Sequence, residues 1–166
     1  PIGASLAEPD MVDTARRIMD VAAAYNCQIL LPKDVVVAVE FKLGAAHRLA
    51  SSDDVADGEM ILDAGAESVA AATAFLDRCS TIVWNGPMGA FEIPPFDAAT
   101  TALACAVAAK TQRDGLMSVA GGGDTMAALA NAGVNDQFSY VSTAGGAFLE
   151  WLEGKRLPGV EALRID

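Results

Sequence analysis

Short apolar runs rich in β-branched residues alternate along this chain with alanine-rich stretches of helical periodicity. The clearest runs lie at residues 81–84 and 116–119, and the clearest helical stretches at residues 96–110 and 125–132. Strands that alternate with helices in this way are typical of βαβ units, in which neighbouring strands lie parallel. We therefore predict an α/β fold, a three-layer, Rossmann-like parallel sheet with helices on both faces.

The remaining elements are predicted on the same grounds. Further strands are expected at residues 28–31, 60–62 and 139–142, a helix that begins at Pro9, another at residues 66–78, and a last one around residues 148–152. The polar stretch at residues 44–58 is expected to be a surface connection that could hold a short strand.

The composition limits the kinds of partner. The 166 residues, 52% of them apolar, suit one domain with one buried core. The net charge of −11 repels nucleic acid and anionic membranes, and no apolar run approaches the roughly 18 residues of a membrane span. The cysteines Cys27, Cys79 and Cys105 are odd in number and lack metal-ligand spacing, so we expect reduced, mostly buried thiols in a cytoplasmic protein. We expect neither a nucleic acid nor a membrane as partner.

A glycine-containing turn follows each of the last three predicted strands. The turns read NGPMGAFE after residue 84, AGGGDT after residue 119 and TAGGAF after residue 142. In an open parallel sheet, such turns lie at the carboxyl edge, where ligands bind. We therefore expect the three turns to line one crevice.

The turn AGGGDT combines glycines, a helix start and a carboxylate. Gly121, Gly122 and Gly123 let a ligand approach the backbone closely, and the N–H groups and dipole of the next helix favour a phosphate. A carboxylate repels a phosphate unless a cation lies between them, and Mg²⁺ commonly takes one or two carboxylates plus substrate phosphates. Asp124 is therefore a candidate Mg²⁺ ligand. The alternative is that Asp124 only caps its helix.

The other two turns offer polar groups at the same edge. Thr143 provides a hydroxyl, and Gly145 and Gly146 permit close approach, although this turn taken alone favours a plain strand-to-helix connection. Two helix starts on one edge could hold two parts of a polyphosphate, or a phosphoryl group in transfer. Asn85 directly follows an apolar strand. Glu92 could accept hydrogen bonds from a sugar diol, although its spacing alone favours an ordinary exposed acid.

These segments, in this order, resemble phosphoglycerate kinase. VWNGPMGAFE, GGGDT and FSYVSTAGGAFLEWLEGKRLPGVEAL are similar to C-terminal signatures of that family, and LLPKDVVVA and GASLAEPD to further stretches. The resemblance extends over essentially the whole chain. It implies a monomeric glycolytic enzyme of two Rossmann-like domains. Such an enzyme transfers a phosphoryl group reversibly between 1,3-bisphosphoglycerate and ADP, with Mg²⁺, to give 3-phosphoglycerate and ATP.

The resemblance also implies roles for single residues. Glu92 matches the acid that binds the ribose hydroxyls, and Asp124 matches the residue that positions the metal. The other matches surround the nucleotide and the transferred phosphoryl group: Asn85, Pro87 and Met88 in the turn beside the nucleotide, Leu62 at the base pocket, Gly122, Gly123 and Thr125 in the phosphate-side loop, and Thr143, Gly145 and Gly146 in the last glycine-rich loop. Two positions depart from the family pattern: Ala144 and Ile61 stand where glycine is common.

Other parts of the family's sequence have no counterpart here. These are the N-terminal domain that binds phosphoglycerate and the first part of the nucleotide domain, with its glycine-rich turn and lysine. Residues 1–166 are therefore expected to be a partial C-terminal nucleotide-binding domain of a two-domain kinase, inactive alone. One alternative is a stand-alone nucleotide-binding module without catalysis. Another is a Rossmann oxidoreductase or methyltransferase, which would need a Gly-x-Gly-x-x-Gly turn that the sequence lacks.

Overall fold

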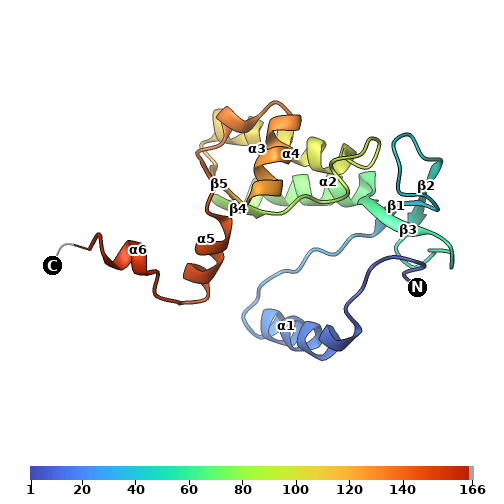
Figure 1. Cartoon of the computed structure of the whole chain (residues 1–166), viewed down its shortest axis with the longest axis horizontal. Coiled ribbons are helices and arrows are strands. Elements are labelled where there is room, and N and C mark those ends of the chain that lie inside the picture. The colour runs from blue at the N-terminus through green and yellow to red at the C-terminus, as the bar shows by residue number, and fades with distance from the viewer. Residues whose placement is uncertain (165–166) are drawn as a thin grey trace.

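The computed structural model describes residues 1–164, which form two three-stranded sheets and the helices around them (Figure 1). One sheet is antiparallel with the order β2-β1-β3, and the other is parallel with the order β4-β5-β6. The strands are β1 (Asp34–Ala38), β2 (His47–Ser51), β3 (Met60–Ala64), β4 (Thr81–Asn85), β5 (Met117–Gly121) and β6 (Tyr140–Ser142). The predicted α/β class with a helix-flanked parallel sheet is confirmed, whereas the antiparallel sheet was not predicted.

Most of the helices lie where the apolar periodicity predicts them. They are α1 (Val12–Ala24), α2 (Ala66–Phe75), α3 (Ala98–Asp114), α4 (Gly123–Asn131), α5 (Gly145–Leu152) and α6 (Pro158–Glu161), with short 3₁₀ turns η1 (Pro9–Met11), η2 (Leu76–Arg78) and η3 (Asn135–Gln137). Helix α3 ends at Gly115, whose φ of 72° lies in the left-handed region that glycine adopts without strain. Within residues 1–164, no helix combines the length and apolar character that a membrane crossing requires.

The parallel sheet and the helices that cross over it share one apolar core. Parallel neighbours need a crossover connection, and α3 and α4 provide the two crossovers, from β4 to β5 and from β5 to β6. The buried side chains of this core come from one face of the sheet and from both helices: Trp84, Ala120, Leu103, Val107 and Leu129. This packing brings the carboxyl ends of β4, β5 and β6 to the same edge.

The opposite face of the parallel sheet is less covered. Val83, Met117 and Tyr140 point away from the core and are about half exposed. Helix α1 lies apart from both sheets in Figure 1, and of its residues only Ala22 is buried. Apolar surface therefore remains open on two sides of the described structure.

Residues 28–31 were predicted as a strand, and this prediction is wrong for the described structure. The segment is extended, but no strand among residues 1–164 pairs with it, and Leu31 remains 67% exposed. A strand requires a neighbour that takes its backbone hydrogen bonds. The surface connection predicted at residues 44–58 contains β2, which pairs antiparallel with β1.

A carboxylate from the antiparallel sheet caps the next helix. Asp34, at the start of β1, accepts the backbone N–H groups of Glu67 at 3.0 Å and Ser68 at 2.8 Å, in the first turn of α2. Burial raises the pKa of Asp34, but the hydrogen bonds from Ser68 and Glu67 outweigh it and lower the pKa below its ordinary value. The ionised carboxylate thus joins β1 to α2.

Candidate functional site

The three glycine turns meet at the carboxyl edge of the parallel sheet. The backbone N–H of Gly86, after β4, donates to the hydroxyl of Thr125 in α4 at 2.8 Å. The N–H of Gly122, after β5, donates to the carbonyl of Ser142, the last residue of β6, at 3.3 Å. The predicted convergence of the three turns is therefore confirmed as geometry.

Two of the turns touch through glycines. A Cβ added to Gly145 would lie 2.5 Å from both the Cα and the N of Gly122, closer than real Cβ contacts. Gly122 itself has φ 102° and ψ 147°, a conformation open to glycine but not to bulkier residues. Glycine is thus required at both positions, and the starts of α4 and α5 lie side by side because neither carries a side chain there.

The start of α4 has the features of an anion site. Gly122 occupies the N-cap position, and no side chain of the described residues caps this helix. Asp124 is exposed in the first turn. The alternative that Asp124 caps α4 is therefore wrong. The N–H groups at this helix start can accept an anion, and Asp124 stands beside them.

The start of α5 lies at the same edge. Ala144 is its N-cap residue and has φ −98°, so the alanine at this position carries no left-handed strain. The N–H of Ala144 donates to the hydroxyl of Ser142 at 3.1 Å. Thr143 and Gly146 are exposed, whereas Gly145 is buried against Gly122.

Leu62 and Met88 lie together at a second part of the candidate site. They line a cavity of about 220 Å³ with Ile61, Gly89 and Ala90 from β3 and the turn after β4. The cavity is mostly apolar and smaller than the roughly 300 Å³ of a complete ligand pocket, so it suits one ring of a larger ligand. Leu62 and Met88, two of the residues expected at the nucleotide, thus border one cavity.

The remaining predicted residues lie at the end of β4 and on the turn that follows it. Asn85 ends the strand and is exposed, and Pro87 is half-buried within the turn. Glu92 is exposed after the buried Phe91, and within residues 1–164 its carboxylate forms no hydrogen bond or ion pair. Among the described residues, no side-chain hydrogen bond joins Glu92 to the glycine turns after β5 and β6. Its carboxylate is available to a ligand.

Comparison with known proteins identifies the family. The family model described as phosphoglycerate kinase matches residues 1–155 of this chain. The chain belongs to the phosphoglycerate kinase family. Phosphoglycerate kinase from Xanthobacter autotrophicus is 63% identical over 163 residues, and that from Azorhizobium caulinodans is 61% identical over the same length. Each match covers 98% of this chain and 41% of the relative.

Solved structures of phosphoglycerate kinase share the fold of the chain. The enzyme from Coxiella burnetii is 46% identical with a TM-score of 0.90, and the match covers 97% of this chain and 40% of that chain. The enzyme from Pyrococcus horikoshii is 28% identical with a TM-score of 0.76, over 93% of this chain and 36% of that chain. The chain thus spans about two-fifths of the length of its phosphoglycerate kinase relatives. The alternative of a Rossmann oxidoreductase or methyltransferase is wrong.

The acidic residues suit a magnesium ion that is shared with a phosphate. Among residues 1–164, no group of three or more His, Cys, Asp or Glu side chains could hold a metal ion alone. Magnesium bound to a phosphate needs only one or two protein carboxylates, because phosphate oxygens and water complete its six ligands. Asp124 supplies one such carboxylate beside a helix start, so the residues present fit this ion.

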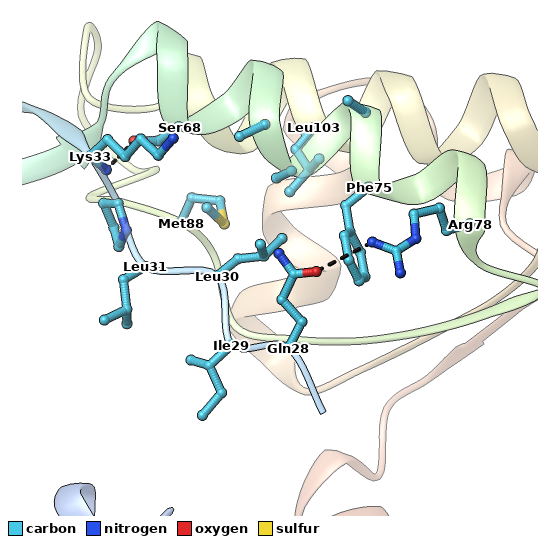
Figure 2. Close-up of a pocket in the computed structure, with 14 residues that line it drawn as sticks. Gln28, Ile29, Leu30, Leu31, Lys33, Ser68, Phe75, Arg78, Met88 and Leu103 are labelled. Atoms are coloured by element: carbon cyan, nitrogen blue, oxygen red, sulfur yellow. Dashed lines mark hydrogen bonds between the residues drawn. The ribbon is translucent and has the colours of Figure 1, made fainter. Parts of the chain in front are cut away.

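A larger cavity of about 580 Å³ lies between residues 28–33 and α2 (Figure 2). Leu30, Phe75 and Met88 point into it, and Arg78 donates to the side-chain oxygen of Gln28 at 3.3 Å at one end. Of the site residues expected in a phosphoglycerate kinase, only Met88 borders this cavity. Sequence reasoning missed the cavity because each of its apolar residues, taken alone, suits an ordinary core.

Proposed function

We propose that this chain is the nucleotide-binding part of a phosphoglycerate kinase. The intact enzyme transfers a phosphoryl group reversibly between 1,3-bisphosphoglycerate and ADP, and so forms 3-phosphoglycerate and ATP in glycolysis. Such an enzyme is a phosphotransferase with a carboxyl group as acceptor. The observation that carries the proposal is the contact between Gly122 and Gly145, which sets two helix starts side by side in a chain of this family.

The helix starts supply the binding of the phosphates. The N–H groups of Gly123, Asp124 and Thr125 receive the phosphates of ADP, and those of Gly145 and Gly146 receive the phosphoryl group in transfer. Phosphoryl transfer needs mainly positioning and fixed positive ends of dipoles, so no covalent intermediate and no general base are required. Magnesium held by Asp124, when bound, neutralises phosphate charge.

The turn after β4 supplies the binding of the nucleoside. Glu92 accepts the ribose hydroxyls, and Leu62 and Met88 border the base in the smaller cavity. Asn85 and Pro87 shape the turn beside the nucleotide. Thr143 offers its hydroxyl near the transferred phosphoryl group. Gly122, which has no side chain, leaves room for a ligand between the starts of α4 and α5.

We also propose that residues 1–166 are part of a domain and catalyse nothing alone. Residues 28–31 have no partner strand among the described residues, β4 pairs with a single neighbour, and apolar side chains of α1 are exposed. The relatives are more than twice as long as this chain. Phosphoglycerate binds, on this proposal, to a part of the enzyme that precedes these residues.

Turnover tests this second proposal. Supplied with 1,3-bisphosphoglycerate and MgADP, the purified 166-residue chain is expected to form no ATP, and measurable formation would overturn the claim of inactivity. Binding of MgADP without turnover is also what a stand-alone nucleotide-binding module would show. The reading frame upstream of this sequence separates the two, because a module would have no phosphoglycerate-binding domain encoded there.

We further expect a monomer in the cytoplasm. The cysteines Cys27, Cys79 and Cys105 are all free, which suits a reducing compartment. Cys27 and Cys105 are exposed, so the expectation that most of these thiols are buried is wrong. The negative charge of the chain favours solubility and opposes self-association.

Calorimetric titration tests the nucleotide site. The chain should bind MgADP more tightly than ADP, and Asp124→Asn should abolish this difference because it removes the carboxylate that shares the ion. Glu92→Gln should weaken both ligands by roughly tenfold, the loss of one charge-assisted hydrogen bond. Asp136→Asn, which alters an exposed aspartate in η3, is the matched control. Equal behaviour of Asp124→Asn and Asp136→Asn would contradict the proposed metal ligand.

A further inference from the structure

Asp63 is a buried carboxylate beside Leu62 that no step above uses. Its side chain is 2% exposed. One carboxylate oxygen accepts the N–H of Ala99, in the first turn of α3, at 2.9 Å, and the other accepts the N–H of Ala64 at 2.9 Å. Asp63 therefore caps α3 from β3, while Asp97 at the N-cap position makes no capping hydrogen bond within the described residues.

The same carboxylate touches the turn of residues 86–92. A Cβ added to Gly89 would lie 2.7 Å from Cγ of Asp63 and 2.6 Å from the carbonyl oxygen of Leu62. The N–H of Ala90 donates to that carbonyl at 2.8 Å. The backbone of the turn is thus pressed against Asp63, three residues before Glu92.

Helix α3 contacts the same turn, so Asp63, the turn of residues 86–92 and the start of α3 form one junction. The hydroxyl of Thr100, which follows Ala99, accepts the N–H of Met88 at 3.0 Å. Thr100 is fully buried. A displacement of the start of α3 is therefore passed through Thr100 to Met88.

We propose that Asp63 is a positioning residue of the nucleotide site. Its carboxylate fixes the start of α3 and the turn of residues 86–92 against β3, and thereby sets the places of Met88 and Glu92. The inference rests on the proposed function, because Met88 and Glu92 are the residues assigned to the nucleoside.

The charge state of Asp63 gives the proposed positioning a pH dependence that can be measured. Burial raises the pKa of Asp63 to about 6; the hydrogen bonds from Ala99 and Ala64 lower it, and the negative charge of Asp97 adds to the rise. Gly89 presents only backbone to the carboxylate. Above pH 6 both oxygens accept N–H groups. Protonation turns one oxygen into a donor that faces an N–H group, so that hydrogen bond should be lost, and the turn should shift locally, as the pH falls through about 6, although the neutral carboxyl costs less to bury.

Amide NMR without nucleotide tests the junction directly. In the wild-type chain, the N–H resonances of Ala64, Ala99, Met88 and Gly89 should shift together between pH 5 and 8, with one midpoint at about 6. Asp63→Asn should abolish that titration, and Asp34→Asn, which alters the cap of α2, should leave it intact. If Ala64 and Ala99 titrate while Met88 and Gly89 do not, Asp63 is only a helix cap and the inference is overturned.

Titration with MgADP tests the effect on binding. At pH 8, Asp63→Asn should bind roughly tenfold more weakly than the wild type, and Asp34→Asn should bind like the wild type. The terminal phosphate of ADP also titrates near pH 6, but it does so equally with the wild type and with each variant. The readout is therefore the ratio of wild-type to variant affinity. That ratio should fall toward one at pH 5, and a ratio of one at pH 8 would overturn the inference. If the wild type binds no MgADP, the proposed function fails, and the amide titration still decides whether Asp63 positions the turn.

Discussion

The hydroxyl of Thr125 accepts the backbone N–H of Gly86 at 2.8 Å, and this bond joins the turn after β4 to the start of α4. Thr125 is 1% exposed, so water cannot replace it. The two turns are therefore held at a fixed spacing before any ligand arrives. Pre-set spacing of this kind is what phosphoryl transfer requires of a protein.

Replacement of Thr125 tests that bond. Thr125→Val keeps the shape of the side chain but leaves the N–H of Gly86 without an acceptor, which should lower the free energy of unfolding by about 1–3 kcal/mol. Thr125→Ser keeps the hydroxyl and loses one methyl group, so it should cost about 1 kcal/mol. Urea unfolding measures both. A valine variant as stable as the serine variant would show that the bond does not hold the turns.

The two glycines of the last turn should respond differently to alanine. In Gly145→Ala the new Cβ meets the backbone of Gly122, which cannot rotate aside, so we expect a loss of about 1–3 kcal/mol. In Gly146→Ala the Cβ meets nothing within 4 Å, and the helix should gain up to about 1 kcal/mol. Thermal unfolding of the two variants gives the comparison. Equal stability would contradict the close contact between the glycine turns.

The cap provided by Asp34 predicts a pH dependence of stability. Asp34→Ala should lower the free energy of unfolding by about 1 kcal/mol at pH 7, through loss of the hydrogen bonds from Glu67 and Ser68. Because the folded-state pKa is lowered, the stabilisation is present above the ordinary value of 3.8 and is lost as the pH falls through the folded-state value. The wild type and the variant should therefore converge in acid. A difference that stays constant down to pH 2 would contradict this origin.

Asp63 predicts the opposite trend. Its folded-state pKa is raised from 3.8 to about 6, so its contribution to stability is fully present below pH 3.8 and is lost as the pH rises through about 6. Relative to Asp63→Asn, which does not titrate, the wild type should lose on the order of 3 kcal/mol across that window. Denaturant unfolding at pH 4, 5, 6 and 7 measures the trend. A wild type that gains stability over the variant in this range would contradict the buried charge.

The parallel sheet could be predicted because its determinants are local. The next helix along the chain after each of β4 and β5 is the one that covers it, so apolar runs and helical periodicity identify both partners. The strand predicted at residues 28–31 failed for the opposite reason. Their apolar pattern suits a strand, but a strand also needs a partner, and the pattern does not indicate whether one is present. The short strand that residues 44–58 could hold was not located as β2, because only Ala50 among its five residues is buried, which leaves no apolar alternation to detect.

The residues of the candidate site could likewise be predicted where their determinants are local and not where they are distant. Asp124 and the glycines could be proposed from sequence because a helix start, a carboxylate and bare backbone occur within one short motif. Asp63 was missed because its role depends on a hydrogen bond with Ala99, 36 residues further along the chain. The residues next to Asp63 in the sequence do not indicate that its carboxylate is buried against a helix start and a turn.

The most direct test of the account is the location of the nucleotide, measured by the shifts that MgADP induces in the amide resonances of the chain. The largest shifts should occur in Gly86, Gly123, Asp124 and Gly146, with smaller ones around Leu62 and Met88. Shifts confined to residues 28–33 and α2, around the larger cavity, or no shifts at saturating MgADP, would contradict it.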